Sequence, residues 1–335
     1  MGAVVAWQAK PGTPVLNNEH APARLLLSLL PNGQEKCEGV RRMSQRKRTR
    51  VRSWLFTPAT RPDRFDKAAT SGADVSIIDL EDSVAPADKD KARRTALAHL
   101  AQPAAGSGGR ALRINGLETR FGLADLHALL ESSAYPDYLV LPKTESAAHL
   151  QILDRLLAEA GKATRLVALI ESAQGLAACE AIAAATPRLE ALLFGAADMS
   201  ADLGAGTAWA PLAYARSRLV AACALAGVLA IDTPFFDVKD REGLTQETSL
   251  AVALGFAGKA AIHPSQIAPI NAALTPRPEE VAQARAILAE SAKGVGVVRG
   301  RMVDEAVARQ ARRILAAAGE PTPGDGSSEP PSTRR

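Results

Sequence analysis

Short apolar segments recur through most of the chain, a few tens of residues apart. Nearly all of them end directly before a charged or polar residue, and Ala/Leu/Arg-rich stretches with apolar residues at helical spacing lie between most of them. This alternation of short strands and helices is typical of a parallel sheet with crossover helices. The eight segments are Trp54–Phe56, Val75–Ile78, Ala111–Leu112, Tyr138–Leu141, Leu166–Ile170, Ala191–Phe194, Val228–Ile231 and Lys259–Ile262.

Eight strand–helix units predict an α/β protein whose sheet closes into a (β/α)8, or TIM, barrel. A chain of 335 residues can hold one such barrel, of ~250 residues, plus terminal additions. In this fold the carboxyl ends of all eight strands open into one mouth, where barrel enzymes keep their chemistry. We therefore read the candidate functional residues from the ends of the apolar segments.

Composition narrows the class of protein. Hydrophobic residues make up 47% and aromatic residues only 4%, which favours an Ala/Leu-rich enzyme over a base-stacking nucleic-acid binder. The three cysteines, Cys37, Cys179 and Cys223, form no CxxC pair and predict a reducing, cytoplasmic location. Residues 1–50 contain no apolar segment of ~20 residues that could span a membrane. The motifs of serine hydrolases, zincins and P-loop proteins are absent.

Both ends of the chain lack the strand–helix pattern. Residues 1–50 show little periodicity, and Met43 is a candidate translation start, so we expect a disordered or mis-started extension there. The formal net charge of +4 is dominated by seven basic residues between Arg41 and Arg52, which we interpret as a solvated tail. Residues 319–335, rich in Pro, Ser and Gly, are expected to be disordered.

Two carboxylates follow neighbouring strands. Glu171 comes directly after Leu166–Ile170, and Asp198 follows Ala191–Phe194 and a short turn. They lie about one strand–helix unit apart, so both side chains should face the same part of the mouth. Two carboxylates in a partly dry pocket favour a cation, and Mg²⁺ accepts one or two of them together with water and substrate oxygens. The alternative is that each acid caps the following helix; we favour the metal site.

Arg113 closes the third apolar segment. A guanidinium at the mouth can bind a substrate carboxylate through two parallel hydrogen bonds. Three acids, Asp79, Glu81 and Asp82, crowd the end of the second segment. We expect these acids to orient metal-bound water, Arg113 or Lys143 without binding the metal themselves.

Lys143 follows the fourth segment in Leu141-Pro142-Lys143. A lysine there could form a Schiff base with a carbonyl substrate. The dense acidic neighbourhood instead favours a charged, ion-paired lysine, because opposite charges raise the pKa of its ammonium.

The order of motifs resembles that of the citrate lyase beta subunit and its stand-alone relatives, the malyl-CoA and citramalyl-CoA lyases. The resemblance runs from about Arg52 to Leu315. It implies a Mg²⁺-dependent barrel that cleaves a 3-hydroxyacyl-CoA into an acyl-CoA and a 2-oxo acid. The motifs are Trp54–Pro58, Arg61–Phe65, Asp79–Val84, Leu112–Asn115, Leu141–Lys143, Ile170–Ser172, Phe194–Asp198, Ile262–Pro264 and Gly300–Asp304.

The resemblance also implies roles for single residues. Glu171 and Asp198 match the metal ligands, through which the substrate oxygens are bound, and Arg113 matches the arginine that binds the substrate carboxylate. Asp304 matches an acid that a C-terminal lid delivers to a neighbouring subunit, which implies a homo-oligomer, trimer or hexamer, and proton transfer by Asp304. From the sequence alone, Asp304 would be the N-cap of a helix over Glu305–Ala318.

Arg61 and Arg64, after the first strand, are candidates for binding the CoA phosphates. With the resemblance, the barrel is expected to span residues 51–275 and the lid segment residues 276–318. Two departures from many relatives, Gly195-Ala196-Ala197 before Asp198 and Thr57-Pro58-Ala59 after the first strand, leave the metal site intact but leave the substrate open.

Two other functions remain open at this point. One is a metal-dependent aldolase that acts on free 4-hydroxy-2-oxo acids, using the same barrel and carboxylate pair without CoA. The other is a subunit that works only within a citrate lyase assembly, on an acyl-carrier protein.

Overall fold

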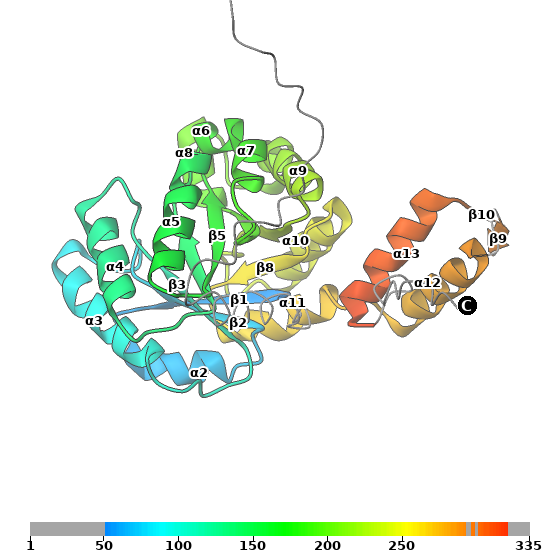
Figure 1. The fold of residues 1–335 in the computed structure, drawn as a ribbon. Coiled ribbons are helices and arrows are strands. Elements are labelled where there is room, and N and C mark those ends of the chain that lie inside the picture. Colours follow the sequence, from blue (N-terminus) through cyan, green and yellow to red (C-terminus); the bar gives the residue numbers. More distant parts are fainter. Residues whose placement is uncertain (1–50, 293–295, 299–300, 321–335) are drawn as a thin grey trace, which may run out of the picture. The chain divides into compact units, whose positions relative to one another are not determined.

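The computed structural model of the protein describes residues 51–292, 296–298 and 301–320 (Figure 1). The chain divides into two units, Met1–Lys47 and Arg48–Arg335, and every described residue belongs to the second. The extension predicted over residues 1–50 and most of the predicted tail, residues 321–335, lie outside the described residues.

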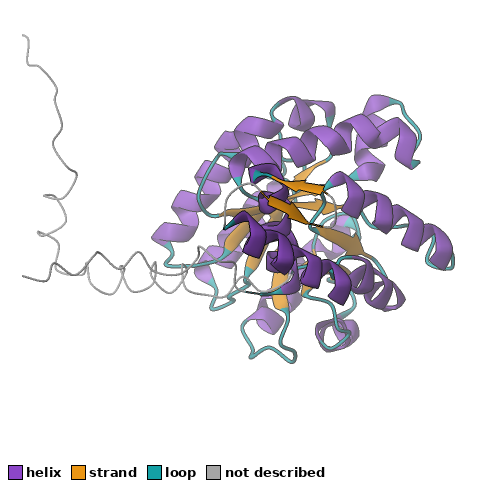
Figure 2. Cartoon of the chain, turned by 90° about the vertical axis from the view of Figure 1, so that its right-hand side faces the viewer, coloured by secondary structure: helices purple, strands orange, loops and turns teal. Residues whose placement is uncertain are grey.

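Eight parallel strands form a closed barrel in the order of the chain, with β1 paired to both β2 and β8. Figure 2 shows these strands enclosed by helices. The predicted (β/α)8 fold is confirmed. The strands are β1 Ser53–Pro58, β2 Val75–Asp79, β3 Gly109–Arg113, β4 Tyr138–Leu141, β5 Arg165–Ile170, β6 Leu189–Phe194, β7 Leu229–Asp232 and β8 Gly258–Ala261.

Helices follow the strands along the chain, as a right-handed strand–helix repeat requires. None of the described helices has the length and apolar character needed to cross a bilayer. The helices up to the end of the barrel are α2 Phe65–Ala69, α3 Lys89–Leu100, α4 Arg120–Glu131, α5 Ala147–Glu159, α6 Ala173–Ala177, α7 Cys179–Ala183, α8 Ala196–Leu203, α9 Trp209–Ala226, α10 Arg241–Leu254 and α11 Ile267–Ala273. Three short 3-10 turns, Pro62–Arg64, Pro86–Asp88 and Pro264–Gln266, complete the connections.

The side chains of β5 alternate between two apolar layers. On β5, Val167 and Leu169 pack with the side chains that fill the barrel. Leu166, Ala168 and Ile170 pack in the larger cluster shared with the helices. Because successive residues of a strand point to opposite faces, the residue that follows each strand inherits a defined direction.

The last predicted strand segment differs from the structure at both ends. β8 begins at Gly258 and ends at Ala261, and Ile262 lies outside it with 39% of its surface exposed. Lys259 is fully buried on the outer face of the strand, where its ammonium donates to Asp232 at 2.6 Å and to Glu247 of α10 at 2.8 Å. A lysine neutralised by two carboxylates can occupy a strand position that would otherwise require an apolar residue.

The same buried cluster continues to α9. The fully buried guanidinium of Arg216 donates from Nε to Asp232 at 2.9 Å and packs against the rings of Trp209 and Phe194. Asp232, the last residue of β7, is therefore held between two cations. This network fixes the carboxyl end of β7 against α9 and α10.

The C-terminal segment has its own small core. Helices α12 (Pro278–Ser291) and α13 (Glu305–Ala318) pack through Ala284, Leu288, Ala308, Ala311 and Leu315. Two short antiparallel strands, β9 (Gly296–Val298) and β10 (Arg301–Val303), lie between the helices in the chain and were not predicted.

Two residues of the predicted tail are described. Gly319 ends α13 in the left-handed conformation that favours glycine, and Glu320 forms an ion pair with Arg285 of α12. The C-terminal helices expected from the sequence are therefore present.

Candidate active site

Three strands end in a charged residue that faces the barrel interior. Asp79 is the last residue of β2, Arg113 is the last residue of β3, and Glu171 follows β5 directly. Asp79 and Glu171 lie two residues after Ile77 and Leu169, which fill the barrel. The alternation of the strands therefore carries these side chains into the mouth.

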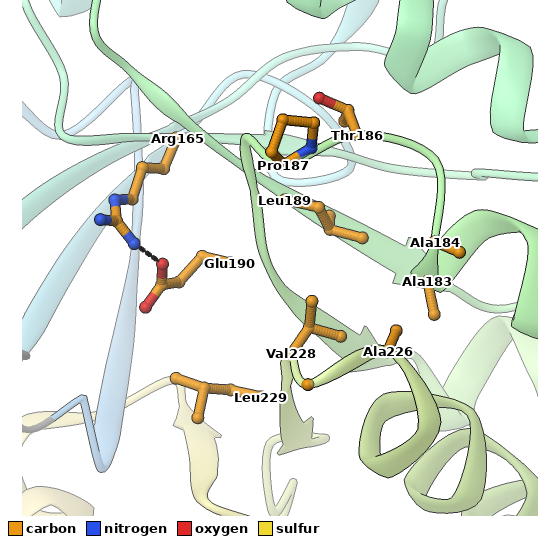
Figure 3. A pocket seen from close by; sticks show the side chains of 11 residues that line it. Arg165, Ala183, Ala184, Thr186, Pro187, Leu189, Glu190, Ala226, Val228 and Leu229 are labelled. Carbon is orange, nitrogen blue, oxygen red and sulfur yellow. Dashed lines mark hydrogen bonds and ion pairs between the residues drawn. The ribbon is translucent and has the colours of Figure 1, made fainter. Parts of the chain in front are cut away.

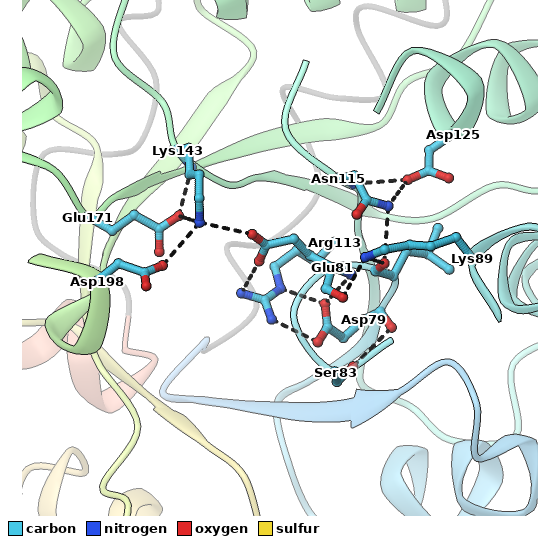
Figure 4. Close-up of polar contacts among 11 residues, drawn as sticks. Asp79, Glu81, Ser83, Lys89, Arg113, Asn115, Asp125, Lys143, Glu171 and Asp198 are labelled. Carbon is cyan, nitrogen blue, oxygen red and sulfur yellow. Dashed lines mark hydrogen bonds and ion pairs between the residues drawn. The ribbon is translucent and has the colours of Figure 1, made fainter. Parts of the chain in front are cut away.

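The two predicted metal ligands, Glu171 and Asp198, face one common cation (Figure 4). The ammonium of Lys143 lies 3.2 Å from Oδ2 of Asp198 and 4.0 Å from Oε1 of Glu171. The backbone N–H of Lys143 also donates to Oε1 of Glu171 at 2.8 Å. Both carboxylates thus converge on the space around a single positive charge.

Neither ligand candidate is the N-cap of the helix that follows it. Ser172 caps α6, with its hydroxyl accepting a hydrogen bond from the N–H of Gly175 at 3.0 Å. Gly195 precedes α8, and Asp198 lies in the first turn of that helix. A Cβ on Gly195 would lie 2.7 Å from Oε2 of Glu171, so the close approach of the two segments requires glycine.

The electrostatics of this pair call for a cation. Burial raises the pKa of Glu171 to about 8, and the carboxylates of Glu81 and Asp198 add to that shift, whereas the contacts of Lys143 oppose it. Burial lowers the pKa of Lys143, but the surrounding carboxylates, Glu171 first, outweigh it and raise that pKa. The lysine therefore stays charged, and the Schiff-base alternative, which needs a neutral amine, is disfavoured.

The donor set fits a hard divalent cation. In the described part of the chain, no group of three or more His, Cys, Asp or Glu side chains is placed to hold a metal ion. Mg²⁺ does not need such a cage, because it retains several water molecules and is bound by one or two carboxylates plus substrate oxygens. Glu171 and Asp198 provide that pair.

Arg113 is held by acids at the end of the neighbouring strand. Its Nε and Nη2 donate to the two oxygens of Asp79 at 2.6 and 2.8 Å. Its guanidinium also lies 4.8 Å from the centre of the Phe56 ring. Burial raises the pKa of the Asp79 carboxyl, but the charge and hydrogen bonds of Arg113 outweigh burial and lower it.

Glu81 connects Arg113 to the metal ligands. Its Oε2 lies 2.8 Å from Nη1 of Arg113 as an ion pair, and its Oε1 accepts a hydrogen bond from Lys143 at 3.2 Å. Burial, followed by the charges of Asp82 and Asp79, raises its pKa despite these two cations. Asp82 itself is exposed. Of the three acids expected to orient Arg113 or Lys143, Asp79 and Glu81 make such contacts.

Sequence reasoning missed the residues that hold the Glu81 loop. The ammonium of Lys89, at the start of α3, donates to the carbonyls of Leu80 and Glu81 at 2.9 and 2.8 Å. Asn115 donates to the Leu80 carbonyl at 3.1 Å and is itself fixed by Asp125. The order of residues gives no signal for this clamp, since a lysine in a polar first turn resembles any exposed one.

It also missed the backbone of Lys143. Its φ of +46° makes it the one non-glycine residue with a positive φ in the part of the chain that the structure describes. Such conformations are costly for residues with a side chain and persist where the surroundings fix them, often at functional sites. Pro142, directly before Lys143, was a local signal of a turn.

Three other predicted residues are exposed and contact groups outside this cluster or cap a helix. Arg61 and Arg64 are exposed after β1, and Arg61 forms a paired contact with Asp63. Asp304 is exposed and caps α13, its carboxylate accepting from the N–H of Val307 at 2.9 Å. The predicted N-cap and the bounds of the predicted helix are confirmed.

A separate pocket lies away from this cluster (Figure 3). It is lined by residues at the beginning of β5, β6 and β7, among them the ion pair of Arg165 and Glu190. The amino ends of barrel strands are the face that serves stability rather than catalysis. The candidate site remains at the opposite, carboxyl ends.

Comparison with known proteins places this geometry in a wider context. A family model described as HpcH/HpaI aldolase/citrate lyase matches residues 52–264. The chain is 41% identical over 296 residues to L-malyl-CoA/beta-methylmalyl-CoA lyase of Rhodobacter capsulatus, covering 79% of this chain and 93% of that protein.

Two solved structures are also similar. RipC from Yersinia pestis is 58% identical, covers 70% of this chain and 99% of its own, and has a TM-score of 0.62. CitE from Mycobacterium tuberculosis, in complex with magnesium, acetoacetate and coenzyme A, is 37% identical. It covers 82% of this chain and 100% of its own, with a TM-score of 0.69.

Proposed function

The chain belongs to the HpcH/HpaI aldolase/citrate lyase family, and on that premise we propose that it is a Mg²⁺-dependent carbon–carbon lyase of CoA thioesters. Its proposed substrate is a 3-hydroxyacyl-CoA of the malyl-, citramalyl- or citryl-CoA type, which it cleaves into an acyl-CoA and a 2-oxo acid. The observation that carries the proposal is the convergence of Glu171 and Asp198 on one cation at the mouth of the barrel.

Glu171 and Asp198 would hold the Mg²⁺ ion. When bound, the ion supplies a Lewis acid that polarises the oxygens of the substrate and makes its hydroxyl more acidic. The N–H of Lys143 and the close backbone of Gly195 fix the Glu171 carboxylate for this role. The relative that was solved with magnesium and coenzyme A supports the choice of ion.

Arg113 would bind the carboxylate of the 2-oxo acid part of the substrate. Asp79 occupies the edge formed by Nε and Nη2, and Glu81 lies against Nη1, so each Nη has a second N–H that could bind a ligand. Because Asp79 holds the guanidinium rigidly, little side-chain entropy is lost when the substrate binds. The orientation of the bond to be cleaved then follows from the position of Arg113.

The reaction is the reverse of a Claisen condensation. The substrate hydroxyl loses its proton to solvent water, the bond between the hydroxyl carbon and the thioester α-carbon breaks, and the hydroxyl carbon becomes the keto carbon of the 2-oxo acid. The electron pair of the broken bond stays on the thioester fragment as an enolate. Asp304 would deliver the proton that converts this enolate into the acyl-CoA.

Three further assignments belong to the same proposal. Arg61 and Arg64, both exposed after β1, would contact the CoA phosphates. Delivery of Asp304 by a neighbouring subunit would make the active protein a homo-oligomer, a trimer or a hexamer. A reducing, cytoplasmic location is supported by the free, buried thiols of Cys179 and Cys223.

The test is turnover of a panel of thioesters by the purified chain. We expect one of malyl-, citramalyl- or citryl-CoA to release a 2-oxo acid in the presence of Mg²⁺, with the activity lost in EDTA. Asp198→Ala should abolish metal-dependent turnover. Glu279→Gln, which changes an exposed acid of α12, should retain it.

Other outcomes would redirect the proposal. Turnover of free 4-hydroxy-2-oxo acids without any turnover of thioesters would make the protein an aldolase. Activity only on an acyl-carrier-protein thioester within a larger assembly would make it a citrate lyase subunit. Unchanged rates in Asp198→Ala would remove the metal site from the mechanism altogether.

A further inference from the structure

Lys143 occupies an unusual position at the centre of the site. Its ammonium lies 3.2 Å from Glu81, 3.2 Å from Asp198 and 4.0 Å from Glu171, so it contacts both candidate metal ligands and the acid behind them. Its backbone adopts a φ of +46°, which an ordinary residue avoids. Three ion pairs therefore place this ammonium among three carboxylates.

The formal charges of the cluster are unequal. Four carboxylates, those of Asp79, Glu81, Glu171 and Asp198, are linked through two cations, Arg113 and Lys143. When all four carboxylates are ionised, as Mg²⁺ binding requires of its ligands, the excess of two negative charges equals the charge of one divalent ion, so a Mg²⁺ ion would leave the cluster neutral. Without Lys143, the same site would hold the ion more strongly and would remain negative afterwards.

We propose that Lys143 is a charge-balancing residue, which weakens Mg²⁺ binding at Glu171 and Asp198 and keeps the loaded site neutral enough to accept an anionic substrate. This inference rests on the metal site of the proposed function. It assigns to Lys143 no covalent step and no metal contact. Its two consequences have opposite signs, since loss of the lysine charge strengthens binding of the cation and weakens binding of the anion.

The distances make the effect large enough to measure. The Lys143 ammonium lies 3.2 and 4.0 Å from oxygens of the two candidate ligands, so an ion bound by those oxygens would be repelled at short range. The Lys143 side chain is 42% exposed, which screens part of this interaction. After that discount, we expect the dissociation constant of Mg²⁺ to change by about tenfold.

The central experiment is calorimetric titration of Mg²⁺ into the metal-free, full-length protein without substrate. Lys143→Gln removes the charge and Lys143→Arg keeps it. Both variants keep a side chain at position 143, so the backbone strain there is the same in the two proteins. We expect Lys143→Gln to bind Mg²⁺ about tenfold more tightly than the parent and Lys143→Arg to bind it as the parent does. Work at alkaline pH limits competition by protons for the carboxylates.

A second variant tests the charge balance without altering the strained position. Glu81→Gln removes one negative charge from an acid that contacts Lys143 and is not assigned as a metal ligand. It should weaken Mg²⁺ binding, and the double variant with Lys143→Gln should return the dissociation constant toward that of the parent. Weaker or unchanged Mg²⁺ binding in a folded Lys143→Gln, or no effect of Glu81→Gln, would overturn the inference.

Binding of the anionic substrate is tested on the Mg²⁺-saturated proteins, with pyruvate as the probe. Lys143→Gln should bind pyruvate more weakly than the parent, and Lys143→Arg should match the parent. Equal binding of pyruvate by all three would refute the substrate half of the inference. If the parent binds no Mg²⁺ at all, the proposed function fails at its metal site, an outcome distinct from the sign of the Lys143 effect.

Discussion

Asp79 and Arg113 sit opposite each other in the register of β2 and β3 and join through two parallel hydrogen bonds of 2.6 and 2.8 Å. Only 3% of the Asp79 side chain and 11% of the Arg113 side chain are exposed. The proposed substrate-binding guanidinium is therefore part of the barrel wall, fixed by a neighbour on the adjacent strand before any ligand arrives.

Removal of Asp79 should release Arg113. We expect Asp79→Ala to lower the free energy of unfolding by about 2 kcal/mol or more, because a buried guanidinium loses its paired acceptor. The KM for the thioester should rise as Arg113 loses its orientation. Urea unfolding and steady-state kinetics measure the two effects. Asp79→Asn, which keeps one acceptor oxygen, should show smaller changes in both.

The free energy of unfolding of the metal-free protein should depend on pH through the ionisation of Glu171. Its pKa is raised to about 8 from an ordinary value of 4.5, so the folded state binds this proton more tightly than the unfolded state does. The contribution to stability is complete below the unfolded pKa and is lost as the pH rises through about 8.

Glu171→Gln cannot ionise and serves as the reference. In EDTA, the melting temperature of Glu171→Gln should rise relative to that of the parent as the pH increases toward about 8. In the parent, stabilisation by Mg²⁺ should grow over the same range, because the metal binds the ionised carboxylate. A difference between the two proteins that does not vary with pH would contradict this prediction.

Gly195→Ala should displace Glu171 and so damage the metal site, because the two segments approach too closely for a Cβ at position 195. The added methyl group would lie 2.6 Å from Cβ and 2.7 Å from Oε2 of Glu171, so both the carboxylate and the backbone that carries it must move. The φ of Gly195 is −102°, so alanine adds no backbone strain. We expect Mg²⁺ to bind at least about tenfold more weakly, a displacement effect typical of metal-ligand support. Calorimetry measures the affinity, and circular dichroism checks the fold.

Asp304 can be tested separately as a helix cap and as a proton donor. Asparagine caps a helix as well as aspartate does, so Asp304→Asn should keep α13 and the melting temperature unchanged. If Asp304 transfers the proton, kcat should fall by about 100-fold or more, with Mg²⁺ binding preserved. Asp304→Ala should lose both the cap and the activity. Normal turnover by Asp304→Asn would exclude the proton-transfer role.

The ion-pair network outside the barrel is predicted to be structural. Lys259→Met would leave the buried Asp232 with one of its two cations and Glu247 without this partner. We expect a loss of about 3–5 kcal/mol in the free energy of unfolding, measured with urea. Arg285→Met, which breaks the exposed ion pair with Glu320, should leave the stability unchanged.

Much of the barrel could be predicted because its strands are short and apolar. Tyr138–Leu141 matches β4 residue for residue, and the predicted Leu166–Ile170 lacks only the first residue of β5. The position of Glu171 followed from the end of β5, and that of Asp198 from the end of β6. The hairpin of β9 and β10 was missed, since three-residue strands without a barrel neighbour leave almost no periodic signal.

Contacts between residues far apart in the chain were harder to predict from the sequence. That Asp79 and Glu81 contact Arg113 could be anticipated from the crowding of charge, but the burial of Lys89 and Lys259 could not. A charged residue is buried only when its partners come from other strands and helices, and the sequence does not show which elements meet. The backbone conformation of Lys143 depends on the same tertiary context, because its N–H donates to Glu171 and its ammonium donates to Asp198.

Since side chains alternate strictly along β5, the location of Glu171 depends on counting as well as on chemistry. Deletion of one residue, such as Ala168, would invert the phase of everything beyond it. The acid would then turn toward the surrounding helices, and Ser172 would replace it at the rim. The orientation of the catalytic side chains thus depends on whether the number of residues inserted into or deleted from a strand is even or odd. Insertions and deletions in the loops are not subject to this constraint.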